Sequence, residues 1–167
     1  MVGLSGSGKS TTAQLLTQQA TAIRLRSDAI RKHLAGVPLQ AKGGDEIYTQ
    51  AMTDKTYTRL IELGGRLASQ GYRVILDAKF DRQAKREEAI ACAQAQNIPL
   101  TFLHCTAPES VLKDRLNRRS GDIADATAAI LAKQSMEPLS IEANVLTIDT
   151  TQPRAAIQQR LAAVFPA

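Results

Sequence analysis

The sequence contains few of the residues that mark disulfide-stabilised, metal-binding or membrane proteins. Its two cysteines, Cys92 and Cys105, match neither a disulfide framework nor a metal-site spacing, which favours a reducing compartment. Neither His33 nor His104 has a second ligand at metal-binding spacing, so we expect both to be structural or surface residues. We recognise neither a membrane-spanning hydrophobic run nor a signal peptide, and we therefore expect a cytoplasmic protein with no membrane partner.

Aromatic residues are scarce as well, with three Tyr, three Phe and no Trp. Nucleic acid bound at an active-site mouth needs aromatic side chains on which bases stack, and few lie near the mouth expected below. Tyr48, Met52, Tyr57 and Phe80 would line an acceptor pocket or, as is more common for sparse aromatics, belong to the core. The sequence thus leaves nucleic acid open as a partner without favouring it.

The length and charge of the chain fit one domain with an anionic ligand. At 167 residues, 44% of them hydrophobic, the chain can form one core, and we expect a single domain over residues 1–167 without repeats or linkers. Lys and Arg number 21 against 16 Asp and Glu, and the net charge of +5 suits a nucleotide or a nucleic acid. An ordinary solvated surface accounts for so modest an excess equally well.

The stretch from Gly3 to Ser10, Gly-Leu-Ser-Gly-Ser-Gly-Lys-Ser, matches the phosphate-loop pattern G-x-x-x-x-G-K-S. Its glycines let successive amide N–H groups point at a triphosphate, and the following helix adds the positive end of its dipole. We expect Lys9 to reach the β- and γ-phosphates and Ser10 to give its hydroxyl to Mg²⁺. A flexible Gly/Ser turn is disfavoured because a helical pattern follows directly. The residues expected to bind the nucleotide here are Ser5, Gly6, Ser7, Gly8, Lys9, Ser10 and Thr11.

Helical and strand-like segments alternate along the rest of the chain. The helical patterns cover residues 10–20, 28–34, 53–69, 82–96, 108–118, 127–134 and 153–164, and the strand patterns cover 22–25, 72–77, 100–104 and 143–148. Such alternation predicts an α/β fold of the three-layer P-loop kind, with a five-stranded parallel sheet and a helical lid at about 119–134.

The beginning of the sequence departs from this plan. A phosphate loop normally follows a buried parallel strand of about four to eight apolar residues, yet only Met1 and Val2 precede Gly3. We therefore expect a truncated first strand and a natural chain that extends before Met1.

Besides the phosphate loop, charged residues mark the predicted carboxyl ends of two further strands, where ligands bind in open parallel sheets. Asp28 and Arg31 share one helix face, so Asp28 would take the proton of an acceptor hydroxyl while Arg31 orients the acceptor or the moving phosphoryl group. A helix cap with an ion pair explains the same spacing. Asp77 follows Val74-Ile75-Leu76, which favours a Mg²⁺ ligand over a helix-capping residue.

Two further arginines precede the predicted lid. Arg115 and Arg119 lie one helical turn apart, just before Ser120-Gly121, where a mobile lid would bring them onto a triphosphate. Closure of such a lid also excludes the water that would otherwise hydrolyse ATP. A solvated basic helix face is the alternative explanation.

Together these motifs resemble the P-loop kinase group that contains polynucleotide 5′-hydroxyl kinases and zeta-toxin-like kinases. Segments 47–57 and 103–109 are most similar to the ATP-binding kinase-like domains fused behind aminoglycoside-phosphotransferase-like domains in bacteria. The resemblance covers about residues 3–150 and implies a phosphotransferase-like domain, fused or separate, as a partner.

The resemblance also assigns roles to single residues. It implies that Asp28 is the general base, Arg31 an arginine that contacts acceptor or phosphate, and Arg119 the lid arginine with Arg115 as a nucleotide-contacting neighbour. Asp77 matches an acid that positions the acceptor, so its role stays open between metal and substrate. Where relatives have a small polar residue, this chain has Lys79, which indicates an anionic acceptor or an ion pair with Asp81.

These observations predict an ATP- and Mg²⁺-dependent kinase that phosphorylates a hydroxyl of a small molecule. ATP is favoured over GTP because the sequence lacks an Asn/Thr-Lys-x-Asp guanine motif. A polynucleotide 5′-hydroxyl kinase is one alternative, and a non-catalytic ATP-binding regulatory module is another. Asp28, Arg31 and the two lid arginines argue against pure binding, because binding alone needs no general base. The acceptor and the oligomeric state stay open.

Overall fold

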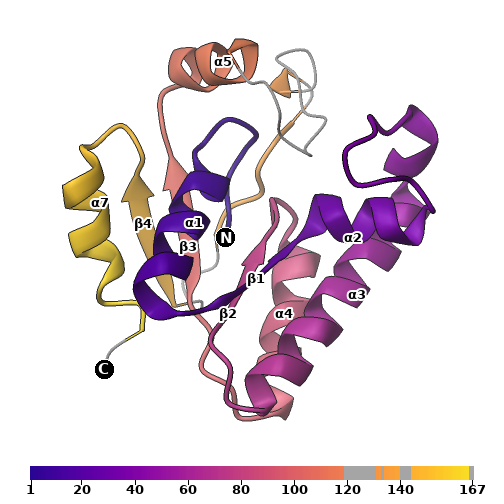
Figure 1. The fold of residues 1–167 in the computed structure, drawn as a ribbon, viewed down its shortest axis with the longest axis horizontal. Helices are drawn as coiled ribbons and strands as arrows, with labels where there is room; N and C mark the ends of the chain where they lie inside the picture. The colour runs from indigo at the N-terminus through magenta and orange to yellow at the C-terminus, as the bar shows by residue number, and fades with distance from the viewer. Residues whose placement is uncertain (119–130, 133, 140–143, 166–167) are drawn as a thin grey trace.

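The computed structural model describes residues 1–118, 131–132, 134–139 and 144–165 (Figure 1). The elements in chain order are α1 (Lys9–Ala20), β1 (Ile23–Arg26), α2 (Ser27–Leu34), the 3₁₀ helix η1 (Asp45–Tyr48), α3 (Gln50–Ser69), β2 (Val74–Asp77), α4 (Gln83–Ala95), β3 (Phe102–Thr106), α5 (Glu109–Asn117), β4 (Val145–Asp149) and α7 (Arg154–Leu161). None of the described helices is long and apolar enough to cross a membrane. The predicted lid lies largely outside the described residues, and Arg119 lies wholly outside them.

The described strands form two parallel pairs instead of the predicted five-stranded sheet. β1 pairs with β2, and β3 pairs with β4. Between the pairs runs the segment before the phosphate loop, where the Met1 amino group donates to the Leu76 carbonyl (2.8 Å) and the Val2 amide donates to the Leu103 carbonyl (2.8 Å). Val2 makes only an isolated parallel bridge, to His104. The prediction of five strands was wrong because two residues are too few to form a ladder with both neighbours.

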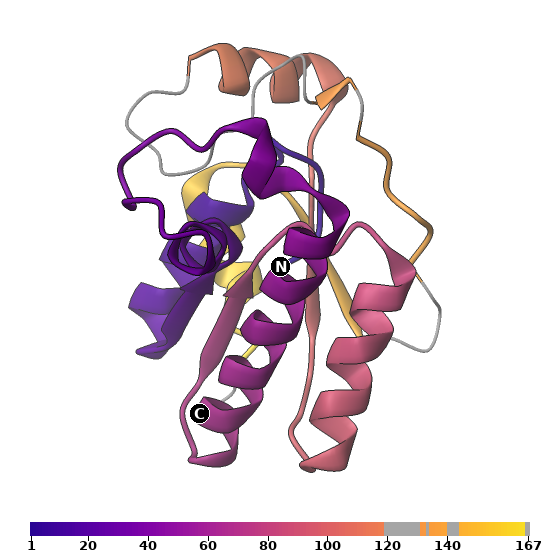
Figure 2. The ribbon, with the colours of Figure 1, turned by 90° about the vertical axis from the view of Figure 1, so that its right-hand side faces the viewer.

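Helices cover both faces of this arrangement. α1 and α7 pack on one face around Leu16, Ile75 and Ile148, while α3 and α4 lie side by side on the other (Figures 1 and 2). Successive residues of the first segment serve opposite faces, with Met1 in one hydrophobic cluster and Val2 in the other. This alternation is the period-two pattern of a strand buried on both sides. The predicted three-layer α/β arrangement is confirmed in this respect.

The predicted helices were placed within a few residues of those observed, except the helix predicted at 127–134, which lies largely outside the described residues. The largest shifts are at the end of α7, which stops at Leu161 instead of Val164, and at the start of α3. α3 begins at Gln50 instead of Thr53 because the Thr49 hydroxyl accepts a hydrogen bond from the Met52 amide (3.2 Å) and caps the helix. α2 begins at Ser27, directly after β1, so Asp28 lies in its first turn. The result that matters for function is that β1 and β2 both end beside the phosphate loop.

Candidate active site

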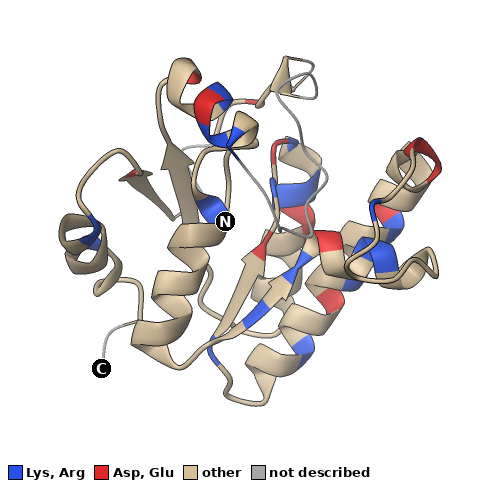
Figure 3. Ribbon diagram, turned by 45° about the horizontal axis from the view of Figure 1, so that its top comes forward, with Lys and Arg blue, Asp and Glu red and all other residues tan. Residues whose placement is uncertain are grey.

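A cavity of about 920 Å³ lies beyond the carboxyl ends of β1 and β2. Basic and acidic segments gather where these strands end (Figure 3). The predicted site residues that line this cavity are Ser5, Gly6, Gly8, Lys9, Ser10, Thr11, Asp28, Arg31, Asp77 and Arg115. Ser7 is not among the lining residues and its side chain is buried. The fold therefore brings together motifs that are separated by more than a hundred residues in the sequence.

The phosphate loop adopts the curled backbone that its glycines permit. Gly6 and Gly8 have φ angles of 80° and 85°, and a Cβ atom on Gly8 would come within 3.0 Å of the Thr150 side chain. Glycine is therefore required at Gly8 both for its backbone conformation and for space. α1 begins directly after it, so the helix N-terminus and the loop amides face the same cavity.

Lys9 lies folded against the inside of this loop. Its Nζ donates to the Leu4 carbonyl at 2.7 Å. Burial lowers the pKa of Lys9 to about 8, although the nearby Cys105 and Asp77 partly oppose this shift. Burial disfavours the charged form of Lys9, and a ligand with several negative charges beside the loop amides would stabilise it.

Ser10 and Asp77 meet at the start of α1 and the end of β2. The Ser10 hydroxyl donates to Asp77 Oδ2 at 3.1 Å, and the carboxylate is 4% exposed. A hydroxyl and a carboxylate are hard oxygen ligands of the kind Mg²⁺ takes, so this pair fits the predicted metal. No group of three or more acidic, His or Cys residues in the described part of the chain could hold a metal ion by itself. Phosphate oxygens and water would have to complete the coordination.

The same carboxylate also has basic partners on the neighbouring strand. Arg24 donates to Asp77 Oδ2 through Nε (3.0 Å) and Nη2 (2.5 Å), and Arg26 Nε lies 3.8 Å from that oxygen. Sequence analysis missed both arginines. The available signal was their i, i+2 spacing, which places them on one face of β1. The parallel register that aligns Arg26 with Asp77 was not available from the sequence.

Asp28 and Arg31 lie on α2 and line the same cavity as the phosphate loop. Asp28 is half-buried, whereas Arg31 is buried and donates to the Ile47 carbonyl (3.0 Å) and to the Thr53 hydroxyl (3.2 Å). The Arg31 guanidinium also lies 5.0 Å from the centre of the Tyr48 ring. Arg31 thus holds η1 and α3 against α2, and its predicted contact with acceptor or phosphate stays a prediction.

Arg115 reaches the phosphate loop from α5. Its Nη1 donates to Thr150 Oγ1 (2.8 Å) and to the Gly6 carbonyl (3.3 Å), and its Nη2 donates to the Thr150 carbonyl (2.8 Å). Thr150 in turn lies within hydrogen-bonding distance of the Ser7 carbonyl (3.0 Å). The arginine therefore supports the loop and does not belong to a solvated helix face. Thr150 was missed, although its place just after a strand marks the sheet edge where ligands bind.

The turn after β2 forms another part of the cavity lining. Lys79 makes an ion pair with Asp81 (2.8 Å), which is one of the two explanations considered for this lysine. The Tyr57 hydroxyl accepts a hydrogen bond from the Phe80 amide (3.1 Å), and burial raises the pKa of Tyr57 to about 12. Tyr48 and Tyr57 line the cavity, while Phe80 lies in the core.

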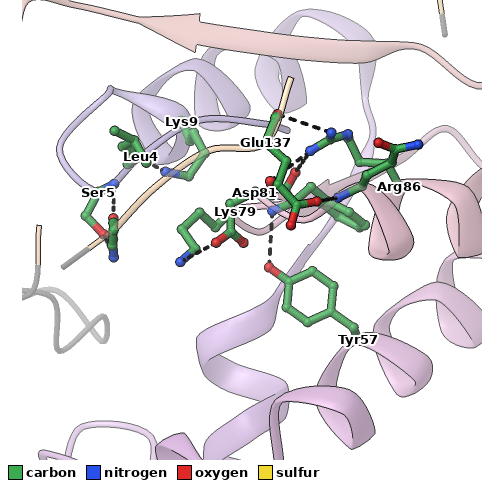
Figure 4. Close-up of polar contacts among 11 residues, drawn as sticks. Leu4, Ser5, Lys9, Tyr57, Lys79, Asp81, Arg86 and Glu137 are labelled. Atoms are coloured by element: carbon green, nitrogen blue, oxygen red, sulfur yellow. Dashed lines mark hydrogen bonds and ion pairs between the residues drawn. The ribbon is translucent and has the colours of Figure 1, made fainter. Parts of the chain in front are cut away.

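Gln134, the last residue of the predicted lid segment, also contacts the phosphate loop, at the Ser5 that Figure 4 labels. Its carboxamide accepts from the Ser5 amide (3.0 Å) and donates to the Ser5 hydroxyl (2.9 Å). Nothing in the local sequence pattern singles out this glutamine.

A family model described as an AAA domain matches residues 1–139. The chain belongs to this AAA domain family. It is 28% identical over 158 residues to uncharacterized proteins of Mycobacterium tuberculosis and Mycobacterium bovis, and the match covers 91% of this chain and 31% of each relative. The AAA domain chain therefore spans about a third of the length of the curated relatives it matches.

Solved structures similar to this AAA domain chain include P-loop kinases. A sugar kinase from Janibacter is 22% identical with a TM-score of 0.69, covering 97% of this chain and 90% of the other. A gluconokinase from Sinorhizobium meliloti is 27% identical with a TM-score of 0.64, covering 97% and 87%. The APS kinase of Mycobacterium tuberculosis, solved with AMPPNP and APS, is 21% identical with a TM-score of 0.68, covering 98% and 91%. The fold is thus an α/β P-loop kinase-like fold.

Proposed function

We propose that this domain is a kinase that transfers the γ-phosphate of ATP to a hydroxyl group of a small molecule, with Mg²⁺ as cofactor. The observation that carries the proposal is that Asp28 lines the same cavity as the phosphate loop. A loop, a lysine and a helix N-terminus suffice to bind a triphosphate. A carboxylate in the same cavity adds a base, which transfer to a hydroxyl uses and nucleotide binding alone does not.

In this mechanism the loop amides and Lys9 hold the triphosphate, and Arg115 fixes the loop through its bond to the Gly6 carbonyl. Asp28 accepts the proton of the acceptor hydroxyl while the hydroxyl oxygen forms a bond to the γ-phosphorus. At the same time the bond between the γ-phosphorus and the oxygen of the leaving ADP breaks. Mg²⁺, when bound, neutralises and orients the phosphates, and Ser10 and Asp77 are the residues that would hold it. Positioning and charge neutralisation supply most of the catalysis in reactions of this type.

The structural relatives favour a small acceptor. They include a sugar kinase, a gluconokinase and an APS kinase, which are small-molecule kinases. The described lining of the cavity contains two tyrosines, and Tyr57 already accepts a hydrogen bond from the main chain. A polynucleotide 5′-hydroxyl kinase stays the second candidate because Asp28-x-x-Arg31 matches that group of kinases.

The length of the curated relatives supports the proposal that this domain works together with another domain. This chain corresponds to 31% of each relative, so the kinase domain would act beside other parts of a longer protein. A phosphotransferase-like domain, fused or separate, is the partner that the sequence resemblance favours.

The test is transfer of labelled γ-phosphate from ATP to pools of sugars, nucleosides and aminoglycosides, compared with 5′-hydroxyl oligonucleotides. Asp28→Asn removes the base, and Asp114→Asn on the exposed surface of α5 is the matched control. Label on a small molecule that depends on Asp28 supports the proposal. Label on the oligonucleotide favours the polynucleotide kinase, and tight ATP binding without any transfer favours a regulatory module.

A further inference from the structure

Residues 134–139, here called the strap, connect the phosphate loop to the turn after β2 (Figure 4). One end of the strap is Gln134, which bonds to Ser5. The other end lies against Asp81, whose carbonyl accepts from the Glu137 amide (2.9 Å). The strap thus contacts two parts of the cavity lining, the phosphate loop at Ser5 and the turn after β2 at Asp81.

The far end of the strap is held by a buried guanidinium. Arg86 is 3% exposed, and its Nη2 donates to the carbonyls of Glu137 (3.2 Å) and Pro138 (2.5 Å). Its Nη1 donates to the carbonyls of Phe80 (2.9 Å) and Asp81 (3.0 Å). Because a guanidinium is planar and rigid, these four bonds fix the strap relative to the turn after β2. Gln134 therefore extends from an anchored segment.

The contact of Gln134 with Ser5 is reciprocal. The Gln134 carboxamide accepts from the Ser5 amide and donates to the Ser5 hydroxyl, so it fixes both the main chain and the side chain of that residue. A neutral amide suits this place because it offers an acceptor and a donor together without adding negative charge beside a phosphate site.

Ser5 lies at the end of the loop where the lysine sits. Lys9 Nζ donates to the carbonyl of Leu4, the residue directly before Ser5. In loops of this type the lysine reaches the β- and γ-phosphates. A change in the orientation of Ser5 should therefore be felt most by a nucleotide that carries the γ-phosphate.

We propose that Gln134 is a positioning residue for ATP, which acts through Ser5 and favours the triphosphate over the diphosphate. The inference rests on the proposed function in that the phosphate loop must bind ATP. It goes beyond that function because it assigns a nucleotide preference to a residue outside the loop motif. The anchored strap supplies the rigidity that this positioning requires.

The test is direct binding of Mg-ADP and of the non-hydrolysable analogue Mg-AMPPNP, measured by calorimetry on the wild-type chain and on Gln134→Ala. Loss of the contact with the Ser5 amide should weaken AMPPNP binding roughly fivefold to tenfold and ADP binding less than about twofold. Gln159→Ala, an exposed glutamine on α7, is the matched control and should change neither constant.

A double-mutant cycle locates the effect at the proposed contact. Ser5→Ala removes only the hydroxyl, so the losses in Ser5→Ala and Gln134→Ala should be less than additive in the double variant if the two residues act together. Equal weakening of both nucleotides, or unchanged binding of both, would overturn the assignment while leaving the kinase proposal intact. A wild-type chain that binds neither nucleotide would overturn both.

Discussion

The hydroxyl of Ser10 donates a hydrogen bond to Oδ2 of Asp77 across 3.1 Å, joining the start of α1 to the end of β2. The same oxygen accepts from Arg24, so this carboxylate is both a potential metal ligand and one partner of a partly buried ion pair. These two roles predict different consequences for variants of Ser10 and Asp77. They can therefore be separated by experiment.

Ser10→Ala should weaken the binding of Mg²⁺ together with the nucleotide, while leaving the free energy of unfolding nearly unchanged. Asp77→Asn should also weaken Mg²⁺ binding, but in addition it should lower the free energy of unfolding by roughly 1 to 3 kcal/mol, because it leaves the partly buried Arg24 guanidinium without its carboxylate. The checks are Mg²⁺ titration of nucleotide binding and urea denaturation of each variant. Asp77→Asn with wild-type stability would contradict the structural part of this account.

The pKa of Lys9 makes a prediction about pH. Burial lowers it to about 8, so the free protein loses the ammonium charge as the pH rises through that value. ATP affinity should then fall by up to about tenfold per pH unit above 8, because binding the triphosphate requires uptake of the proton. Calorimetric titrations between pH 7 and 9.5 would measure this slope. A flat affinity across that range would show that Lys9 keeps its proton or does not contact the phosphates.

The lowered pKa of Lys9 also affects stability, and in the opposite direction: a higher pH weakens ATP binding but stabilises the fold. A lysine with a lowered folded-state pKa releases its proton before the unfolded chain does, so its burial destabilises the fold below about pH 8, and this penalty falls as the pH rises toward 10.5. Lys9→Met should therefore raise the melting temperature at pH 7 while abolishing ATP binding. Lys55→Met, at an exposed position of α3, is the control and should change neither.

The sequence predicted the parts of this site that depend on local pattern. The phosphate loop, the start of α1 and the acid at the end of β2 each follow from a few neighbouring residues, and parallel connections place all strand ends at one edge. The partners of Asp77 could not be predicted in this way, because Arg24 reaches it only through the pairing of β1 with a strand 50 residues away. The contacts of Thr150 and Gln134 with the loop could not be predicted either, because both residues are distant from the loop in sequence.

The division of the sheet into two pairs has a similar origin. Alternating patterns indicate which segments are strands, but the ladder on each side of Val2 depends on how many residues precede Gly3. The ion pair of Lys79, in contrast, could be predicted from the local sequence. Its ion pair with Asp81 joins positions two apart, and sequence analysis had considered it.

Asp28→Asn should separate binding from transfer. The amide keeps the size of the side chain but cannot accept the proton of a hydroxyl, so kcat should fall by a factor on the order of 10² to 10⁴ with ATP affinity unchanged. Single-turnover transfer and direct nucleotide binding are the two measurements required. Full activity in this variant would remove Asp28 as the base and leave the cavity without an assigned one.

Arg115→Lys tests whether the geometry of the arginine matters or only its charge. Arg115 uses two nitrogens to bond the hydroxyl and carbonyl of Thr150 and the carbonyl of Gly6, a set that a single ammonium cannot reproduce. Both Arg115→Lys and Arg115→Ala should therefore weaken ATP binding, by roughly tenfold if one or two hydrogen bonds to the loop are lost. Arg118→Lys, at an exposed position just after α5, provides the control. If Arg115→Lys instead binds ATP as well as the wild type, Arg115 acts through its positive charge on the nucleotide and not through support of the loop.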